Sequence, residues 1–191
     1  MDQSVYCPGL WALHELRRLI FKRPCLSTLE KIISPFDNSQ ASHLVVGYVH
    51  RAYPELLLNM ATYAGFQSCL LVRGFEGGIL PSLNGKSKFY SQFNGAEVIE
   101  SNVDPQLAGI SSEHRSIPLL EKGQAIESIV DCAKKEGLAA LNGEDGETLK
   151  SLILTASLIF SHVKAIELSE AAEEVRDAIH SGKALDHFKA F

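Results

Sequence analysis

The chain has 191 residues, of which 46% are hydrophobic, and a net charge of −5 at pH 7. A chain of this length buries roughly 70% of the surface that it exposes when unfolded, so we expect one α/β domain over residues 1–191. The acidic balance argues against a generally basic nucleic-acid binder but leaves room for a local basic patch.

The cysteines and the apolar runs indicate the cellular compartment of the protein. Four widely spaced cysteines form no CxxC pair, which argues against a zinc site or a disulfide framework and favours reduced thiols. The N-terminal MDQSVYCPG lacks the regions of a signal peptide. The apolar run around Ile153–Phe160 is far shorter than the roughly 20 residues of a membrane span. We therefore expect a cytoplasmic protein with no membrane partner.

The first 36 residues predict a helical lead-in. Apolar residues over Pro8–Arg23 recur at helical spacing. Ser27 and Glu30 have the spacing of a capping box, and Pro35 ends the run, so a short helix over residues 28–33 is expected.

The central part, residues 43–118, is expected to be rich in sheet. His43–His50 is a β-branched apolar run typical of a buried strand. Helical spacing follows and ends at Gly65, and Ser68–Gly74 predicts a second buried strand. Strand, helix and strand with short links indicate a βαβ unit and therefore parallel pairing.

Turn signals and helical patterns organise the rest of the chain. Asn84-Gly85 is a turn signal, and strands are expected in NGKSKFYSQF and in GAEVIESNV. An irregular segment reaches to about Pro118, and the C-terminal part, residues 124–191, is expected to be helical. Its three predicted helices are Gln124–Leu141, Glu147–Lys164 and Ser169–Ser181, with Gly182 suited to end the last one.

The stretch Leu70–Pro81 carries three glycines around one glutamate. Gly74 and Gly77 follow a predicted parallel strand, where glycines allow a close approach of the backbone and where α/β proteins bind ligands. However, no helix begins after the glycines, and Glu76 would repel a phosphate unless a metal lay between them. Two interpretations stay open: a loop that faces a ligand, or a turn between two strands.

Two other groups are candidates for binding. Arg17, Arg18, Lys22 and Arg23 form a basic cluster that suits a carboxylate, a phosphate or a nucleic-acid backbone, unless it is a solvated helix face. His50 follows a strand, so it either lines the same cleft as the glycines or is a hydrogen-bonded structural histidine. No Ser-His-Asp or Cys-His arrangement stands out, and no catalytic residue is assigned.

Taken together, six stretches resemble the C-terminal part of the anthranilate phosphoribosyltransferase family. Their order and spacing extend over nearly the whole chain. They are LRRLIFKR (Leu16–Arg23), SP (Ser34–Pro35), HLVVGYVHRAYPELL (His43–Leu57), LLVRGFEGG (Leu70–Gly78), NGEDGETLKSLILTASLIF (Asn142–Phe160) and AAEEVRDAIHSGKAL (Ala171–Leu185). The stretch TLEKIISPF and the arginine of VRG resemble a divergent subgroup rather than the enzyme of tryptophan biosynthesis.

This resemblance implies a fold and a chemistry. The implied fold is a mainly parallel sheet flanked by helices, as in the C-terminal part of the catalytic domain of nucleoside phosphorylases and phosphoribosyltransferases. In the implied reaction, the pentosyl group of phosphoribosyl pyrophosphate leaves pyrophosphate with the help of Mg2+ and is captured by an amine. Arg17 and Arg18 match the arginines that hold the carboxylate of a small aromatic substrate, and Arg18 is the preferred one.

Three departures count against this chemistry in the present chain. The family's GTGGD diphosphate loop, and the helical domain that supplies its usual dimer contacts, do not occur in this sequence. Ile79 and Leu80 stand where the family has a metal-binding Asp-Glu pair, and neither offers the oxygen ligands that Mg2+ requires, which leaves Glu76. Thr155 stands where the family has an asparagine. No metal site and no cofactor are therefore assigned.

Three hypotheses follow. The leading one is a glycosyl (phosphoribosyl) transferase-like protein that is inactive as this isolated chain. The alternative is a non-catalytic module that binds nucleic acid or another polyanion through the Arg17–Arg23 cluster. The third is a chain with an exposed sheet edge that needs a missing N-terminal half or a second copy of itself. The expected ligand is a small aromatic or anionic molecule, with Arg17, Arg18, Arg23, His50, Gly74, Glu76 and Gly77 as candidate contacts.

Overall fold

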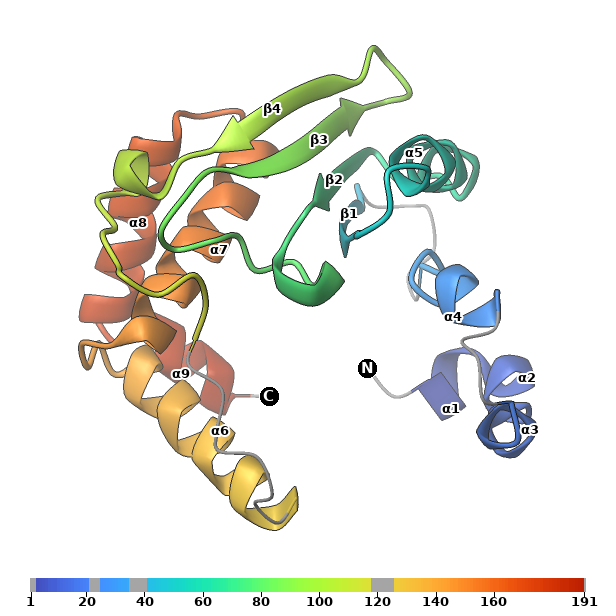
Figure 1. Ribbon diagram of the computed structural model, residues 1–191, viewed down its shortest axis with the longest axis horizontal. Helices are drawn as coiled ribbons and strands as arrows, with labels where there is room; N and C mark the ends of the chain where they lie inside the picture. The colour runs from blue at the N-terminus through green and yellow to red at the C-terminus, as the bar shows by residue number, and fades with distance from the viewer. Residues whose placement is uncertain (1–2, 21–24, 35–40, 118–125, 191) are drawn as a thin grey trace.

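The computed structural model describes residues 3–20, 25–34, 41–117 and 126–190. Its strands form one sheet, with α5 against one face and α7 against the other (Figure 1). In chain order the elements are α1 (Gln3–Tyr6), α2 (Pro8–Trp11), α3 (His14–Arg18), α4 (Leu26–Leu29), β1 (His43–Gly47), α5 (Tyr53–Tyr63), β2 (Ser68–Val72), the 3-10 turn η1 (Phe75–Gly77), β3 (Ser87–Phe93), β4 (Ile99–Val103), η2 (Pro105–Ala108), α6 (Ile126–Leu141), α7 (Glu147–Lys164), α8 (Leu168–His180) and α9 (Lys183–Lys189).

The sheet has the order β1-β2-β3-β4 and is mixed. β1 runs parallel to β2, with Val45 opposite Leu70, as the strand–helix–strand pattern predicts. β3 is antiparallel to both β2 and β4, so the described sheet is mixed rather than mainly parallel, whereas the expected α/β fold with helices flanking the sheet is confirmed. The connection between β2 and β3, residues 73–86, contains the 3-10 turn η1 but no α-helix. A parallel return usually crosses over through an α-helix that packs on the sheet.

β2 is buried along its whole length, as its apolar run predicts. Because side chains alternate along a strand, its residues serve two cores. Leu70 and Val72 pack with residues of α7 and α8, whereas Cys69 and Leu71 pack with residues of α5. The sheet is therefore covered on both faces at β2, and the two cores share this strand.

A buried polar chain joins β2, β3 and α7. The Ser68 hydroxyl is hydrogen-bonded to Nδ1 of His43 at 2.7 Å and to Nε2 of His162 at 2.8 Å. The Ser91 hydroxyl is hydrogen-bonded to Nδ1 of His162 at 3.1 Å, and the Phe93 ring stacks on the imidazole. Both ring nitrogens of His162 are thus satisfied inside the protein. Burial nevertheless lowers the pKa of His162 to about 4.

The β3–β4 hairpin confirms the two strands predicted after residue 84, but its turn lies elsewhere. Asn94 and Gly95 both have positive φ angles, 48° and 66°, which is the conformation of the two central residues of a type I′ hairpin turn. Asn84-Gly85 precedes β3 instead and Gly85 has no positive φ. Gly65 and Gly182 do have positive φ angles and follow α5 and α8, as expected of residues that end helices.

The N-terminal lead-in is helical but broken. The expected single helix over Pro8–Arg23 is replaced, within the described residues, by the short helices α2 and α3, neither of which buries a residue. Without a buried face, no tertiary packing sustains a long helix. In place of the short helix predicted over residues 28–33, α4 begins at Leu26 and ends at Leu29, and because its N-cap is Cys25, Ser27 and Glu30 do not form a capping box.

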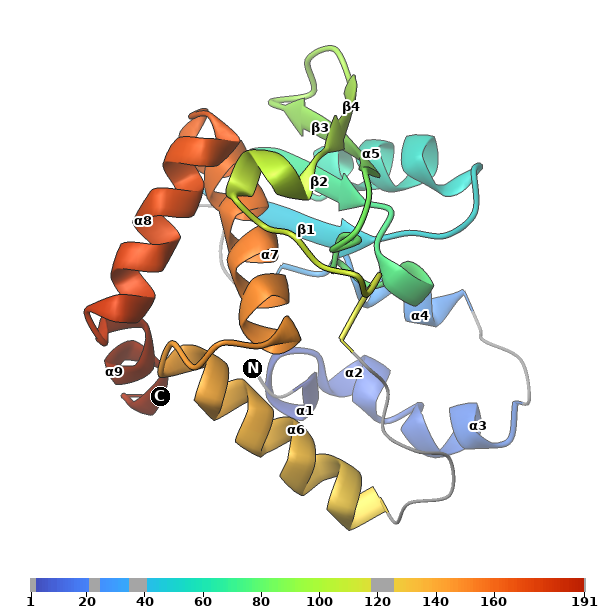
Figure 2. The ribbon, with the colours of Figure 1, turned by 60° about the vertical axis from the view of Figure 1, so that its left-hand side comes forward.

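The C-terminal helices agree closely with their patterns. α7 has the bounds predicted for it, and α8 begins and ends one residue earlier than predicted. α6 ends at Leu141 as predicted, its predicted start at residue 124 lies outside the described residues, and α9 was not predicted. α8 packs along α7 and α9 follows α8, with α6 reaching away from the base of α7 (Figure 2). No helix in the described ranges is by itself long and apolar enough to cross a membrane, and α7 and α8 pass this test only together, across a bend of 119°.

Candidate functional site

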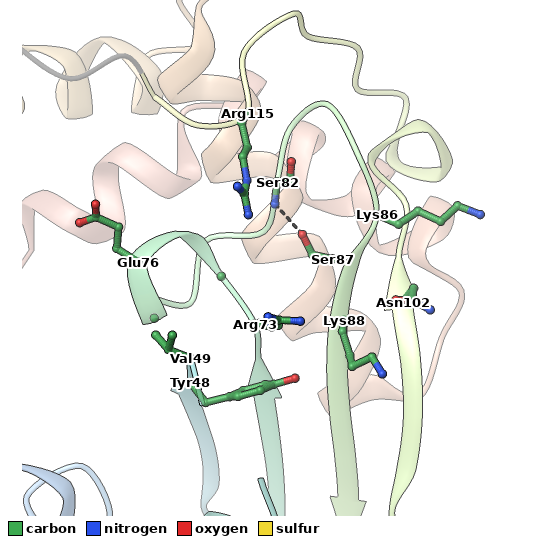
Figure 3. A pocket seen from close by; sticks show the side chains of 12 residues that line it. Tyr48, Val49, Arg73, Glu76, Ser82, Lys86, Ser87, Lys88, Asn102 and Arg115 are labelled. Atoms are coloured by element: carbon green, nitrogen blue, oxygen red, sulfur yellow. Dashed lines mark hydrogen bonds between the residues drawn. The ribbon is translucent and has the colours of Figure 1, made fainter. Parts of the chain in front are cut away.

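A pocket of about 590 Å³ opens beyond the carboxyl ends of β1 and β2 (Figure 3). Tyr48 and Val49, directly after β1, form one wall. The glycine-containing segment after β2 forms another, and the start of β3 forms a third. This is the edge of the sheet at which α/β proteins bind ligands. The structure therefore unites both interpretations of the glycine segment: it connects two strands and it also lines the pocket.

Three glycines hold this segment, hereafter the glycine loop (residues 73–81), against the end of β1. A Cβ atom on Gly47 would collide with the backbone of Gly77 and Gly78, and one on Gly74 would collide with the carbonyl oxygen of Gly78. Gly77 has a φ of +78° and lies against the Val49 side chain. The glycines therefore bring the loop backbone closer to β1 than any residue with a side chain would allow.

The pocket is strongly cationic for an acidic protein. Its wall carries four basic residues but one carboxylate, that of Glu76. Lys86 lies 3.5 Å from Asp104, and Lys88 is paired with Glu100, a hydrogen bond that raises the pKa of the Lys88 ammonium. Among the described residues, neither hydrogen bond nor ion pair engages the two remaining basic side chains, the guanidinium groups of Arg73 and Arg115.

Tyr48 adds a neutral donor to this site. Burial, followed by the neighbouring Tyr90, raises the pKa of its phenol to about 12. The ring is 5% exposed and packs against that of Tyr90, with 5.7 Å between the ring centroids. The hydroxyl group therefore stays protonated at any pH at which the protein is handled, and it remains a hydrogen-bond donor or acceptor rather than a base.

The structure brings three of the predicted site residues together, since Gly74, Glu76 and Gly77 all line the pocket. His50 does not line it and instead lies exposed beside Tyr53, with 5.9 Å between the ring centroids. Arg18 lies outside it too, with a side chain that is 70% exposed and 3.6 Å from Glu15.

The Arg17 side chain is bound within the N-terminal helices rather than directed into the pocket. Its guanidinium pairs with both oxygens of the Glu30 carboxylate and lies 3.0 Å from the Ser27 hydroxyl. This hydrogen bonding lowers the pKa of Glu30. Arg17 therefore links α3 to α4. Ser27 and Glu30, which have the spacing of a capping box, serve as the partners of this arginine. Arg23 lies outside the described residues.

The basic residues of the pocket were missed by sequence reasoning. Lys86 and Lys88 did carry a signal, since alternate residues at the start of a strand face the same side. Arg115 carried none, because it belongs to an irregular segment. Its backbone carbonyl accepts a 2.9 Å hydrogen bond from the Leu83 amide, and this long-range contact brings it to the pocket.

The pocket does not fit a magnesium ion. Mg2+ needs several oxygen ligands, and carboxylates are the usual protein donors. Here the wall contains one carboxylate and four cationic side chains, and within the described residues no three His, Cys, Asp or Glu side chains are grouped so that they could hold a metal. Ile79 and Leu80 occupy the loop where the resemblance places carboxylates. Thr155, which matches an asparagine in the resemblance, has a buried hydroxyl without a partner.

Comparison with known proteins gives several partial matches in sequence. No family model matches the chain. An uncharacterized protein of Aquifex aeolicus is 33% identical over 81 residues, 42% of this chain and 25% of that protein. An anthranilate phosphoribosyltransferase of Colwellia psychrerythraea is 24% identical over 184 residues, 95% of this chain and 48% of the enzyme. A pyrimidine-nucleoside phosphorylase of Staphylococcus epidermidis is 31% identical over 130 residues, 63% of this chain and 29% of that enzyme.

Solved structures give the fold. A variant anthranilate phosphoribosyltransferase of Saccharomyces cerevisiae with Mg bound superimposes with a TM-score of 0.68 and 16% identity, over 94% of this chain and 49% of the enzyme. The Thermus thermophilus anthranilate phosphoribosyltransferase gives a TM-score of 0.65 and 19% identity, over 96% of this chain and 51% of the enzyme. The chain thus spans about half or less of the length of these relatives.

The helices and the mixed sheet define an α/β protein with the fold of phosphoribosyltransferases and nucleoside phosphorylases. Within this class, the resemblance to the anthranilate phosphoribosyltransferases that the sequence predicts is confirmed over nearly the whole chain, and its extent is consistent with their C-terminal part.

Proposed function

We propose that this chain is a phosphoribosyltransferase-like protein that does not, by itself, transfer the pentosyl group of phosphoribosyl pyrophosphate. The fold and the position of the pocket support the relationship. The observation that carries the proposed inactivity is the composition of the pocket wall, which contains four basic side chains but only one carboxylate, that of Glu76. Such a site attracts anions and repels Mg2+.

The chemical reason is the charge that develops on the leaving group. Transfer from a pyrophosphate ester depends on positioning and on electrostatic stabilisation of the departing diphosphate. With Ile79 and Leu80 in the glycine loop, this part of the chain offers no pair of carboxylates to hold a bridging metal ion. A bound phosphoribosyl group would then be held without the metal that the reaction requires.

A direct assay tests this proposal. The purified 191-residue chain is incubated with anthranilate, phosphoribosyl pyrophosphate and Mg2+, and pyrophosphate release is followed, with a full-length anthranilate phosphoribosyltransferase as the positive control. We expect no release above the protein-free background. Release that depends on both substrates, and that falls in a Glu76→Gln variant, would overturn the proposal.

The proposal includes the cellular compartment of the protein. We place the protein in the cytoplasm, because its four cysteines are free thiols. Cys69 is buried, and this burial raises the pKa of its thiol to about 12, so it stays protonated and unreactive.

A second function, the binding of nucleic acid or another polyanion through the Arg17–Arg23 cluster, is supported only by the exposure of Arg18. Arg17 is already paired with Glu30, which removes one of the cluster's phosphate contacts. Titration with an oligonucleotide at several salt concentrations tests this function, since phosphate contacts weaken as salt rises. Binding that is absent at low salt, or unchanged by Arg18→Ala, would exclude it.

A further inference from the structure

The four basic residues of the pocket are not equivalent. Lys86 and Lys88 face the carboxylates of Asp104 and Glu100, so most of their charge is already balanced. Arg73 and Arg115 are exposed, and among the described residues their guanidinium groups have neither a hydrogen bond nor a carboxylate partner. The pocket therefore holds about two positive charges that no protein anion neutralises.

These two side chains come from distant segments and reach the same space. Figure 3 shows Arg115 extending toward Ser82 and Ser87 from above, and Arg73 extending into the pocket from the end of β2. Glu76 points away from both on the other side of the glycine loop. The one carboxylate of the pocket wall is thus not placed to neutralise either arginine.

A buried hydroxyl supplies a donor beside the arginines. Ser87 is 6% exposed, and its oxygen accepts a 2.7 Å hydrogen bond from the Ser82 amide. A hydroxyl also has one proton to donate, and the structure gives that proton no acceptor among the described residues. An acceptor atom in the pocket that Ser87 lines would therefore complete the hydrogen bonding of this hydroxyl.

From this geometry we propose that the pocket is a metal-independent site for a phosphate group, in which Arg73 and Arg115 bind the phosphate oxygens and the Ser87 hydroxyl donates to one of them. A phosphomonoester carries close to two negative charges at neutral pH, which matches the two unpaired guanidinium groups. Planar guanidinium groups bind phosphate oxygens in pairs. The arginines take the place that a metal ion would have in balancing the charge.

The size of the pocket favours a small phosphorylated molecule. Its volume of about 590 Å³ falls within the range of sites for ligands of nucleotide size, on the order of 300–1,000 Å³. The site is bounded by the end of β1, the glycine loop and the start of β3 rather than extended along the surface. This inference holds whether or not the chain transfers a pentosyl group, so its test is independent of the turnover assay.

Calorimetric titration with ribose 5-phosphate, with inorganic phosphate and with ribose tests the proposal, each in the presence of EDTA. We expect both phosphates to bind saturably despite the chelator, and ribose not to bind. Arg73→Gln and Arg115→Gln should each raise the Kd for ribose 5-phosphate about tenfold or more, because each removes a charge-assisted hydrogen bond. Both side chains are exposed, so circular dichroism should show that the variants fold normally.

Lys134→Gln is the matched control, because this exposed basic residue of α6 does not line the pocket and its loss should leave the Kd within about twofold. Equal Kd values for the wild type and both pocket variants would overturn the proposal, and so would binding that EDTA abolishes. Tighter, Arg73-dependent binding of a short single-stranded oligonucleotide would overturn the small-ligand assignment and make a nucleic-acid backbone the ligand.

Discussion

His162 is a basic residue that the fold keeps neutral. It lies 7% exposed between α7 and the sheet, where serine hydroxyls engage both of its ring nitrogens. A neutral imidazole has one donor and one acceptor nitrogen, so two hydroxyl groups satisfy it completely. An imidazolium would have two donors and a charge, and the closest titratable group, His43, would repel it.

Stability should therefore fall as the solution becomes more acidic. The pKa of His162 is about 4 in the folded protein and about 6.5 when unfolded, so protonation favours unfolding. The contribution is complete above pH 6.5 and is lost as the pH falls toward 4, by on the order of 3 kcal/mol. The pKa values of Glu30 and Glu147 are lowered by their basic partners, so the contributions of these carboxylates to stability are lost only below about pH 4.5.

Urea unfolding at several pH values between 7.5 and 4.5 measures this effect. The His162→Gln variant should lose most of the pH dependence, although it is less stable at pH 7.5. The His180→Gln variant, altered at an exposed histidine, should keep the wild-type slope. An unchanged slope in His162→Gln would show that other groups cause the dependence.

Single residues also show what a sequence can predict of a site. Gly74, Glu76 and Gly77 were found because a local pattern, glycines after a strand, places them at the sheet edge. Arg115 could not be found, because only the backbone pairing of its segment with Leu83 brings it there. Arg17, which pairs with Glu30, was predicted to bind a ligand, since a basic pair on a helix has the same sequence pattern whether it contacts a ligand or a partly buried carboxylate.

At the scale of elements, the glycine loop depends on close backbone contacts. Gly74→Ala would place a methyl group on the carbonyl oxygen of Gly78, and neither backbone segment is free to move far. We expect a loss of about 1–3 kcal/mol in the free energy of unfolding, typical of overpacking, together with weaker phosphate binding. Urea unfolding and the calorimetric titration measure the two effects.

Gly137→Ala is the matched control, because a Cβ atom at this position in α6 meets no atom within 4 Å. Alanine favours the helix, so this variant should be more stable by about 0.5–1 kcal/mol. If both alanine variants change stability in the same direction, the collision at Gly74 is not the cause.

The sequence predicted helices and strands best where the residues of the element itself determine its structure. α7 could be bounded from its apolar period and β2 from its buried run, because both are packed on the faces that the patterns indicate. The direction of β3 could not be predicted from its own pattern, since it depends on how the chain reverses through the glycine loop. Pro8–Arg23 was predicted as one helix because periodicity alone does not reveal that α2 and α3, its described helices, bury no residue.

At the scale of the whole molecule, apolar side chains remain uncovered on the N-terminal helices. Val5, Leu16 and Leu19 are 76%, 59% and 75% exposed, and Trp11 and Ile20 are about half exposed. β1 is also the edge of the described sheet. Exposed apolar groups and open sheet edges favour association. We therefore expect the chain to associate with a second copy of itself, or with the other half of a transferase-like protein where one is present.

Sedimentation velocity over a range of concentrations tests this. The wild type should show an average mass that rises with concentration above 20.9 kDa, and a Leu16→Lys, Leu19→Lys double variant should remain closer to the monomer. Leu107→Lys, which alters an equally exposed leucine on η2, should behave like the wild type. A monomeric wild type at every concentration would contradict the expectation.

The position of β2 has a consequence for how the molecule unfolds. Leu70 and Leu71 are neighbours in sequence but belong to different cores, one with α7 and one with α5. Neither core is complete unless β2 is in place, so neither can open and leave the other intact. The sheet and its covering helices should therefore melt in a single cooperative transition. Because the glycine loop and its pocket begin where β2 ends, they share the stability of that unit and do not open independently of it.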